Sequence, residues 1–180
     1  MPRIPALTDA NAPPEVQAFF AAITGKIGMV PNLYRTTAHS PVTLAALLGL
    51  GDALSKGKLT AREREAIALT VAGANACDYC ASAHSAISGG MNVTPDQISA
   101  HLRGRSSVPR MAALLSLARS VTEKRGRLGD GDLVVARNAD LTDADIIEVI
   151  GVVVANIFTN YLTHAFDTDI DFPRVHANAA

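Results

Sequence analysis

The sequence predicts an all-α fold, and three observations support this prediction. Helix-start signals recur along the chain, and patterns typical of β-strands are nearly absent. Alanine is abundant while aromatic residues make up only 4% of the chain, which suits closely packed helices. With 48% hydrophobic and 18% charged residues over a length of 180, the composition is that of a globular protein. No linker or shift of composition divides the chain, so we expect one domain over residues 1–180.

Helix signals divide the chain into eight expected helices. They cover residues 13–25, 41–55, 60–75, 77–88, 95–103, 109–125, 130–138 and 142–165. Residues 29–32 are expected to form a connector, with a short helical turn after it. Ser40 precedes Pro41, which is an N-cap followed by proline at the first helical position. Thr60 stands three residues before Glu63, the spacing of a capping box.

The later helices carry the same kinds of signal. Thr94 and Gln97 combine a capping box with Pro95 at the helix start. Residues 107–109 open the next apolar segment with a serine and a proline. Thr142, together with Asp145, opens the last and most apolar helix.

Charge and hydropathy exclude some partners. The formal net charge is −1 and no basic run is present, so we expect no binding to nucleic acid. The N-terminal residues contain no apolar stretch typical of a secretory signal. The most apolar segment, Ile146–Phe158, is short for a bilayer span and contains Glu148, so no membrane partner is expected. These features predict a cytoplasmic protein, and a reducing cytosol makes structural disulfides rare.

Both cysteines of the chain lie in the stretch CDYCASAH, from Cys77 to His84. A CxxC pair in a cytosolic protein indicates redox chemistry or metal binding. Cys80 and His84 are separated by four residues, so their side chains are neighbours on one face of the predicted helix. Cys77 falls in the first turn, where free backbone N–H groups and the helix dipole favour a thiolate.

The helix before the cysteines supplies a carboxylate. If the two helices form an antiparallel hairpin that breaks near Asn75, Glu65 lies roughly 15 Å before the turn and His84 roughly 12–13 Å after it. The sequence therefore predicts a row formed by Glu65, His84 and Cys80, in which a carboxylate orients a base that acts on a nucleophile.

Three interpretations of the cysteines are open. They are small buried residues, or ligands of a zinc ion whose fourth ligand would have to be His164, Asp78 or Glu65, or a redox dithiol. The dithiol is favoured, because one cysteine can be oxidised and the other can close a disulfide across one helical turn.

Glu65, eleven intervening residues, the CDYC stretch and His84 resemble the core motif of the alkylhydroperoxidase D-like proteins of the carboxymuconolactone decarboxylase-like superfamily. The flanking segments VPNLYRTTAHSP and NYLTHAFDTDIDFP are similar to peroxidase-related members. This resemblance implies an all-α domain, assembly as a homotrimer or homohexamer, and reduction of hydroperoxides by thiols without haem, flavin or metal. An unknown dithiol would serve as the reductant.

The same resemblance implies roles for individual residues. Cys80 would be the peroxidatic cysteine and Cys77 the resolving one, while Glu65 and His84 would belong to a proton relay. Tyr79 stands where the best-known members have a second histidine. A tyrosine hydroxyl is a poor base at neutral pH, but it can donate a hydrogen bond.

Two further functions and one further pair of residues are kept as alternatives. A lyase of the decarboxylase branch would not depend on a CxxC pair, and a non-enzymatic oligomeric helical protein would need none. Asn160 and His164 repeat the spacing of Cys80 and His84 near the end of the chain, and they are candidates to line the same site.

Overall fold

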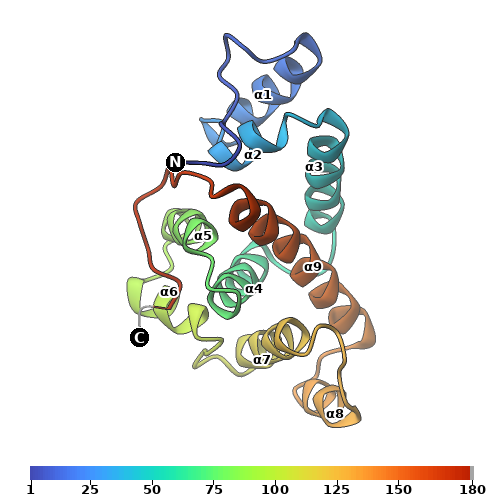
Figure 1. The fold of residues 1–180 in the computed structure, drawn as a ribbon. Helices are drawn as coiled ribbons and strands as arrows, with labels where there is room; N and C mark the ends of the chain where they lie inside the picture. Colours follow the sequence, from blue (N-terminus) through green and yellow to red (C-terminus); the bar gives the residue numbers. More distant parts are fainter. Residues whose placement is uncertain (179–180) are drawn as a thin grey trace.

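The structure is a computed structural model that describes residues 1–178. Within these residues it contains nine α-helices and no strand, which confirms the predicted fold class (Figure 1). The helices are α1 (Pro14–Ile27), α2 (Asn32–Thr37), α3 (Pro41–Ser55), α4 (Ala61–Ala74), α5 (Asp78–Gly90), α6 (Pro95–Leu102), α7 (Pro109–Glu123), α8 (Asp130–Asn138) and α9 (Asp143–Phe166). The expected turn after the connector is α2.

The capping boxes predicted from sequence hold the starts of the central helices. Thr60 Oγ1 accepts a hydrogen bond from the Glu63 backbone N–H, and the Glu63 carboxylate accepts one from the Thr60 backbone N–H at 2.8 Å. Asp145 caps the start of α9 in the same way. Arg110 of α7 donates to both capping carboxylates at 2.9 Å. One guanidinium thus ties together the first turns of α4, α7 and α9.

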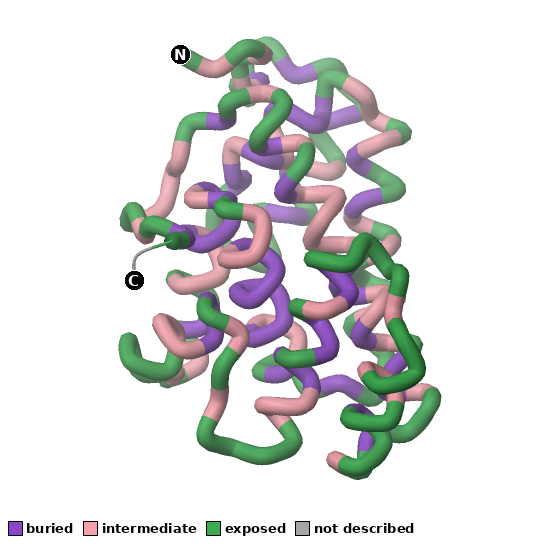
Figure 2. The backbone as a smooth tube through the Cα atoms, turned by 60° about the horizontal axis from the view of Figure 1, so that its bottom comes forward, coloured by how far each residue is buried: buried purple, intermediate pink, exposed green. Residues whose placement is uncertain are grey.

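Helix α4 is the centre of the molecule. Its residues 66–72 are each 2% exposed or less. It packs against α5, α6, α7 and α9, and buried backbone concentrates at this centre in Figure 2. Gly73 permits the contact with α6, because a Cβ at this position would lie 2.0 Å from the Leu102 carbonyl oxygen. Burying α4 on several sides fixes the position of the hairpin that it forms with α5.

Helix α9 is longer than the apolar run that the sequence analysis considered. Its 24 residues are long and apolar enough to cross a membrane by length and composition alone, so the expectation that this segment is too short is wrong. The core helix of a soluble protein meets the same test. In this fold α9 packs against α3, α4 and α7. Glu148 accepts hydrogen bonds from the backbone N–H groups of Lys58 and Leu59, which explains a charge on an apolar helix.

The turn between α4 and α5 lies where the sequence predicts it, near Asn75. Asn75 ends α4, and Cys77 is the N-cap of α5. Ala76 between them adopts a left-handed conformation with φ of 54°, and the Cys77 backbone N–H donates to the Ala72 carbonyl at 2.9 Å. This is a Schellman ending, for which glycine is the usual residue. Because alanine stands where glycine is usual, this helix ending has no clear signal in the sequence.

Candidate active site

The N-cap position places the Cys77 sulfur among hydrogen-bond donors. Cys77 Sγ accepts a hydrogen bond from the Cys80 backbone N–H at 3.4 Å and lies 3.3 Å from Thr163 Oγ1 on α9. A hydrogen bond from the Cys80 thiol, helped by Thr163, the Cys80 N–H and the charge of His164, lowers the pKa of Cys77 to about 6 despite its burial. These contacts favour a thiolate at Cys77.

Cys80 lies one turn further into α5 and is equally buried. Its sulfur is 3.9 Å from Thr163 Oγ1 and 4.0 Å from Thr159 Oγ1. The hydrogen bond that its thiol donates to Cys77, together with burial and the negative charge of Cys77, raises the pKa of Cys80. The opposite shifts favour a thiolate on Cys77 over a thiolate on Cys80.

His84 and Glu65 are in direct contact across the helical hairpin. His84 Nδ1 lies 2.8 Å from Glu65 Oε2, and both side chains are about one-fifth exposed. Burial alone would lower the pKa of His84, but the charge and hydrogen bond of Glu65 outweigh it, and a hydrogen bond to Asn156 adds to them. The net effect raises the pKa of His84. The imidazolium is thus available as a proton donor near neutral pH.

A mostly apolar cavity of about 520 Å³ brings these groups together. Cys80, His84 and Glu65 line it, and its apolar walls come from residues of α1, α2, α3, α5 and α9. Cys77 does not line this cavity. It lines a separate, polar depression on another side of the α5 start, together with Thr163 and His164. The two sulfurs, although hydrogen-bonded, face different environments.

The Tyr79 hydroxyl is hydrogen-bonded to groups outside the Glu65–His84 pair. It donates to Asp171 Oδ1 at 2.9 Å and accepts from the Leu33 backbone N–H at 3.0 Å. Burial raises the pKa of this hydroxyl well above its usual range, so it stays protonated. The ring meets Phe172 edge-on, with centroids 6.0 Å apart. Tyr79 joins α5 to α2 and to the C-terminal segment.

Asn160 and His164 lie on the same helix, α9, but in different surroundings. Asn160 is fully buried and its side-chain oxygen accepts a hydrogen bond from Asn75 at 2.9 Å. It lines neither the apolar cavity nor the polar depression. His164 lines the polar depression beside Cys77. Within residues 1–178 no three His, Cys, Asp or Glu side chains are grouped so that they could hold a metal ion. Asp78, a suggested zinc ligand, instead contacts His176 at 2.9 Å.

Several residues near the site were not singled out from the sequence. Thr159 and Thr163 approach the sulfurs, Asn156 approaches His84, and Tyr34 lines the cavity from α2. The threonines and Asn156 repeat every three to four residues on α9, so one face of that helix carries them all. Such a polar face within an apolar helix was the signal that could have revealed them.

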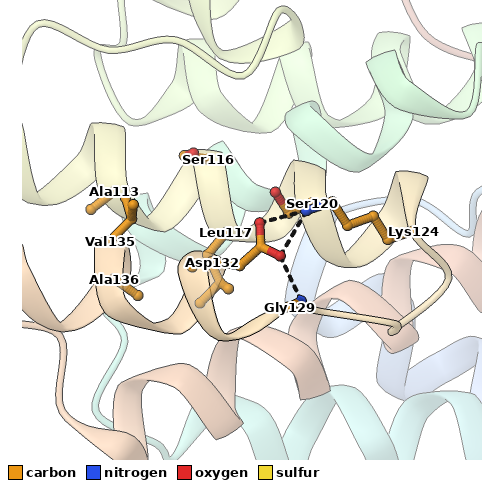
Figure 3. Close-up of a pocket in the computed structure, with 10 residues that line it drawn as sticks. Ala113, Ser116, Leu117, Ser120, Lys124, Gly129, Asp132, Val135 and Ala136 are labelled. Atoms are coloured by element: carbon orange, nitrogen blue, oxygen red, sulfur yellow. Dashed lines mark hydrogen bonds and ion pairs between the residues drawn. The ribbon is translucent and has the colours of Figure 1, made fainter.

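A second hollow, of about 500 Å³, lies between α7 and α8 (Figure 3). Asp132 there pairs with Lys124 at 2.6 Å and accepts from the Gly129 backbone N–H at 2.8 Å. The hollow is lined by no cysteine or histidine. Its charged groups, Lys124 and Asp132, are paired with each other, so we place the chemistry at the cysteines.

Residues 41–124 match the carboxymuconolactone decarboxylase family. No protein among the curated sequences matches the chain. A peroxidase-related protein with an alkylhydroperoxidase core from Ralstonia eutropha JMP134 superposes with a TM-score of 0.83 and 27% identity, over 94% of this chain and 92% of that one. A peroxidase-related protein from Silicibacter sp. TM1040 gives 0.81 and 26%, over 93% of each chain.

A third solved structure has a different activity in its name. The debrominase Bmp8, as a cysteine-to-alanine variant in complex with 2,3,4-tribromopyrrole, superposes with a TM-score of 0.79 and 21% identity, over 93% of this chain and 91% of that one. At this identity the likeness shows the fold alone. The family match covers the helical hairpin and both cysteines, and the two peroxidase-related structures extend the likeness over nearly the whole chain. The chain therefore resembles the carboxymuconolactone decarboxylase family over residues 41–124 and has the fold of the alkylhydroperoxidase D-like, peroxidase-related proteins.

Proposed function

We propose that the protein is a thiol-dependent peroxidase that reduces hydroperoxides through a dithiol–disulfide cycle of Cys80 and Cys77. One observation carries the proposal: Cys80 lines the same cavity as the Glu65–His84 pair, and the Cys77 sulfur accepts a hydrogen bond from the Cys80 backbone N–H. A nucleophile and a proton donor thus share one cavity, and a resolving cysteine lies beside the nucleophile. The 27% identical peroxidase-related structure supports the same class of activity.

The first half of the cycle needs a thiolate at Cys80 and a proton for the leaving oxygen. As Cys80 attacks, its proton moves to the Cys77 sulfur. The Cys80 sulfur bonds to the terminal oxygen of the hydroperoxide, the O–O bond breaks, and the leaving alkoxide takes a proton from the His84 imidazolium. The products are an alcohol and a sulfenic acid on Cys80.

The second half forms the disulfide. Cys77 attacks the Cys80 sulfur, and the hydroxide that leaves takes the Cys77 proton to become water. Thr163 and the Cys80 backbone N–H remain beside Cys77 after Cys80 is oxidised and favour its thiolate, so they also favour this step. An external dithiol then reduces the disulfide by exchange. The cavity is mostly apolar, so organic hydroperoxides fit it better than hydrogen peroxide does.

A second candidate activity is reductive removal of bromine from a small aromatic ring. An apolar cavity of about 520 Å³ beside a cysteine would accommodate such a ring, and the debrominase of the same fold binds a tribromopyrrole. The electron balance would be the same, because two thiols become a disulfide while carbon–bromine is replaced by carbon–hydrogen. Release of bromide from tribromopyrrole in the presence of a dithiol would identify this activity.

We further propose a cytoplasmic protein that assembles as a homotrimer or homohexamer. Reducing conditions would return the disulfide to the dithiol.

The proposed assembly rests on an apolar face of α9. This helix carries Ile147, Val154 and Tyr161 at intervals of seven residues, and these side chains are 68%, 52% and 61% exposed. Residues seven apart share a helical face, so they form a continuous apolar stripe of the kind that interfaces between subunits bury.

A thiol count tests the proposed function directly. The reduced protein contains two thiols, both free. One equivalent of cumene hydroperoxide should remove both, and mass spectrometry should find an intramolecular disulfide and one equivalent of cumyl alcohol. Cys80→Ser should retain Cys77 as a free thiol under the same conditions. Unchanged thiols in the wild-type protein would contradict the proposal.

A further inference from the structure

Tyr34 brings a third kind of polar group to the cavity that holds Cys80, Glu65 and His84. It is the third residue of the short helix α2. Its ring is partly buried and packs against two hydrophobic clusters, one around the cysteines and one formed by the N-terminal helices. Packing on both sides restricts the ring, so its hydroxyl has a defined position in the cavity.

The Tyr34 hydroxyl is available to a ligand. Burial raises the pKa of Tyr34, and the negative charges of Glu65 and Cys80 raise it further, so the hydroxyl keeps its proton. Within residues 1–178 no hydrogen bond from another group contributes to this pKa shift. The hydroxyl oxygen is not fully buried, so a ligand that enters the cavity can reach it. Tyr79, by contrast, uses its hydroxyl twice within the protein.

Helix α2 is held over the cavity by the C-terminal segment. Asp171 Oδ2 accepts from the Asn32 backbone N–H at 2.8 Å, while Asp171 Oδ1 accepts from Tyr79. The Asn32 side chain donates to the Asp169 carbonyl at 3.0 Å. Asn32 is therefore fixed to the C-terminal segment, and the next residue, Leu33, is fixed to α5 through Tyr79. This arrangement explains what Tyr79 does: it positions the helix that carries Tyr34.

We propose that the Tyr34 hydroxyl donates a hydrogen bond to the leaving oxygen of an organic hydroperoxide while Cys80 attacks the terminal oxygen. This inference rests on the proposed peroxidase function and adds a catalytic residue to it. Negative charge develops on the leaving oxygen as the O–O bond breaks, and a donor fixed in a mostly apolar cavity stabilises that charge. His84 supplies the proton that turns the alkoxide into an alcohol, and Tyr34 keeps its own proton.

The basicity of the leaving oxygen gives the test. Cumene hydroperoxide releases a strongly basic alkoxide, whereas peracetic acid releases the weakly basic acetate. We measure single-turnover oxidation of reduced wild-type protein and Tyr34→Phe by each oxidant. Loss of the donor should slow the reaction with cumene hydroperoxide about 10- to 100-fold, somewhat less than the loss of an oxyanion-hole donor. The reaction with peracetic acid should change little, because acetate needs no such stabilisation.

Thr24→Val is the control, because Thr24 is an exposed hydroxyl residue of α1 that does not line the cavity. It should oxidise at the wild-type rate with both oxidants. If Tyr34→Phe is oxidised more slowly than wild type by the same factor with both oxidants, Tyr34 has a packing role and the inference is overturned. An oxidation rate equal to that of wild type with both oxidants would overturn it too. A wild-type protein that neither oxidant converts to the disulfide would instead overturn the proposed peroxidase function.

Discussion

His84 Nδ1 lies 2.8 Å from Glu65 Oε2, although the two residues are nineteen positions apart in the sequence. The contact crosses the α4–α5 hairpin and places a charged carboxylate against an imidazole that is itself near Cys80 in the same cavity. An imidazole held in this way has a fixed orientation and a stabilised positive charge. In our account this pair delivers the proton that the leaving oxygen needs.

Glu65→Gln should remove most of the upward shift in the pKa of His84. The pKa of His84 should fall, because the charge of Glu65 raises it in the wild-type protein. Nuclear magnetic resonance of the His84 ring protons over a pH range measures this shift. Peroxidase turnover near neutral pH should drop about 10- to 100-fold, because the proton donor is less often charged and less well oriented. An unchanged His84 titration would contradict the pairing.

The same pair makes stability depend on pH in a defined direction. The folded-state pKa of His84 is raised, so its contribution is fully present below the unfolded-state pKa of about 6.5 and is lost as pH rises through the folded value. In urea denaturation of the reduced protein, wild type should exceed Glu65→Gln in free energy of unfolding by more at about pH 6 than at about pH 9. A difference that grows with rising pH would show that the sign is wrong.

The thiolate of the reduced protein should belong to Cys77. Ultraviolet absorbance of the thiolate should titrate with a midpoint of about 6. Cys80→Ala removes the largest stabilising contact and Thr163→Val removes another, so both variants should titrate at higher pH. Thr24→Val, a change in the distant helix α1, serves as the control and should leave the midpoint unchanged. A midpoint that stays near 6 in Cys80→Ala would mean that the two sulfurs are independent.

Tyr79→Phe should lower stability more than a change at the surface. It leaves the buried Leu33 N–H and the Asp171 carboxylate without their shared partner. The free energy of unfolding should fall by about 1–3 kcal/mol. Thr24→Val on the exposed face of α1 should have almost no effect in the same denaturation experiment. If both variants unfold alike, the link between α5, α2 and the C-terminal segment does not stabilise the fold.

The apolar stripe of α9 predicts the state of assembly. Light scattering of the purified protein should give the mass of a trimer or a hexamer of the 18.8 kDa chain. Val154→Glu places a charge in the middle of the stripe and should shift the protein toward smaller species, because burying an unpaired charge at an interface is costly. Glu123→Lys, an exposed change on α7, is the control. A wild-type protein of one chain mass would refute the assembly.

The local parts of the fold and site followed from sequence, and the tertiary parts did not. Capping boxes such as Thr60–Glu63 are written within four residues, and the Glu65–His84 contact follows from two nearly equal distances to one turn. Thr163 and Tyr34 come from segments distant in sequence, and helix packing alone decides that they meet the cysteines.

The division of labour between the sulfurs is the point at which the structure adds most. Sequence arguments favoured Cys77 as the more acidic thiol and Cys80 as the one beside a base. The structure places these properties on different residues, because the Cys80 thiol donates to Cys77 while only Cys80 lines the cavity with His84. Acidity alone would assign the attack to Cys77, and access to the proton donor assigns it to Cys80.

Trapping of the sulfenic acid tests the assignment to Cys80 most directly. Cys77→Ser and Cys80→Ser proteins are treated with one equivalent of cumene hydroperoxide in the presence of dimedone and then digested for mass spectrometry. Our account predicts a dimedone adduct on Cys80 in Cys77→Ser, because the attacking thiol is intact and its resolving partner is missing. It predicts no adduct in Cys80→Ser. An adduct on Cys77 in Cys80→Ser, with none on Cys80 in Cys77→Ser, would contradict it.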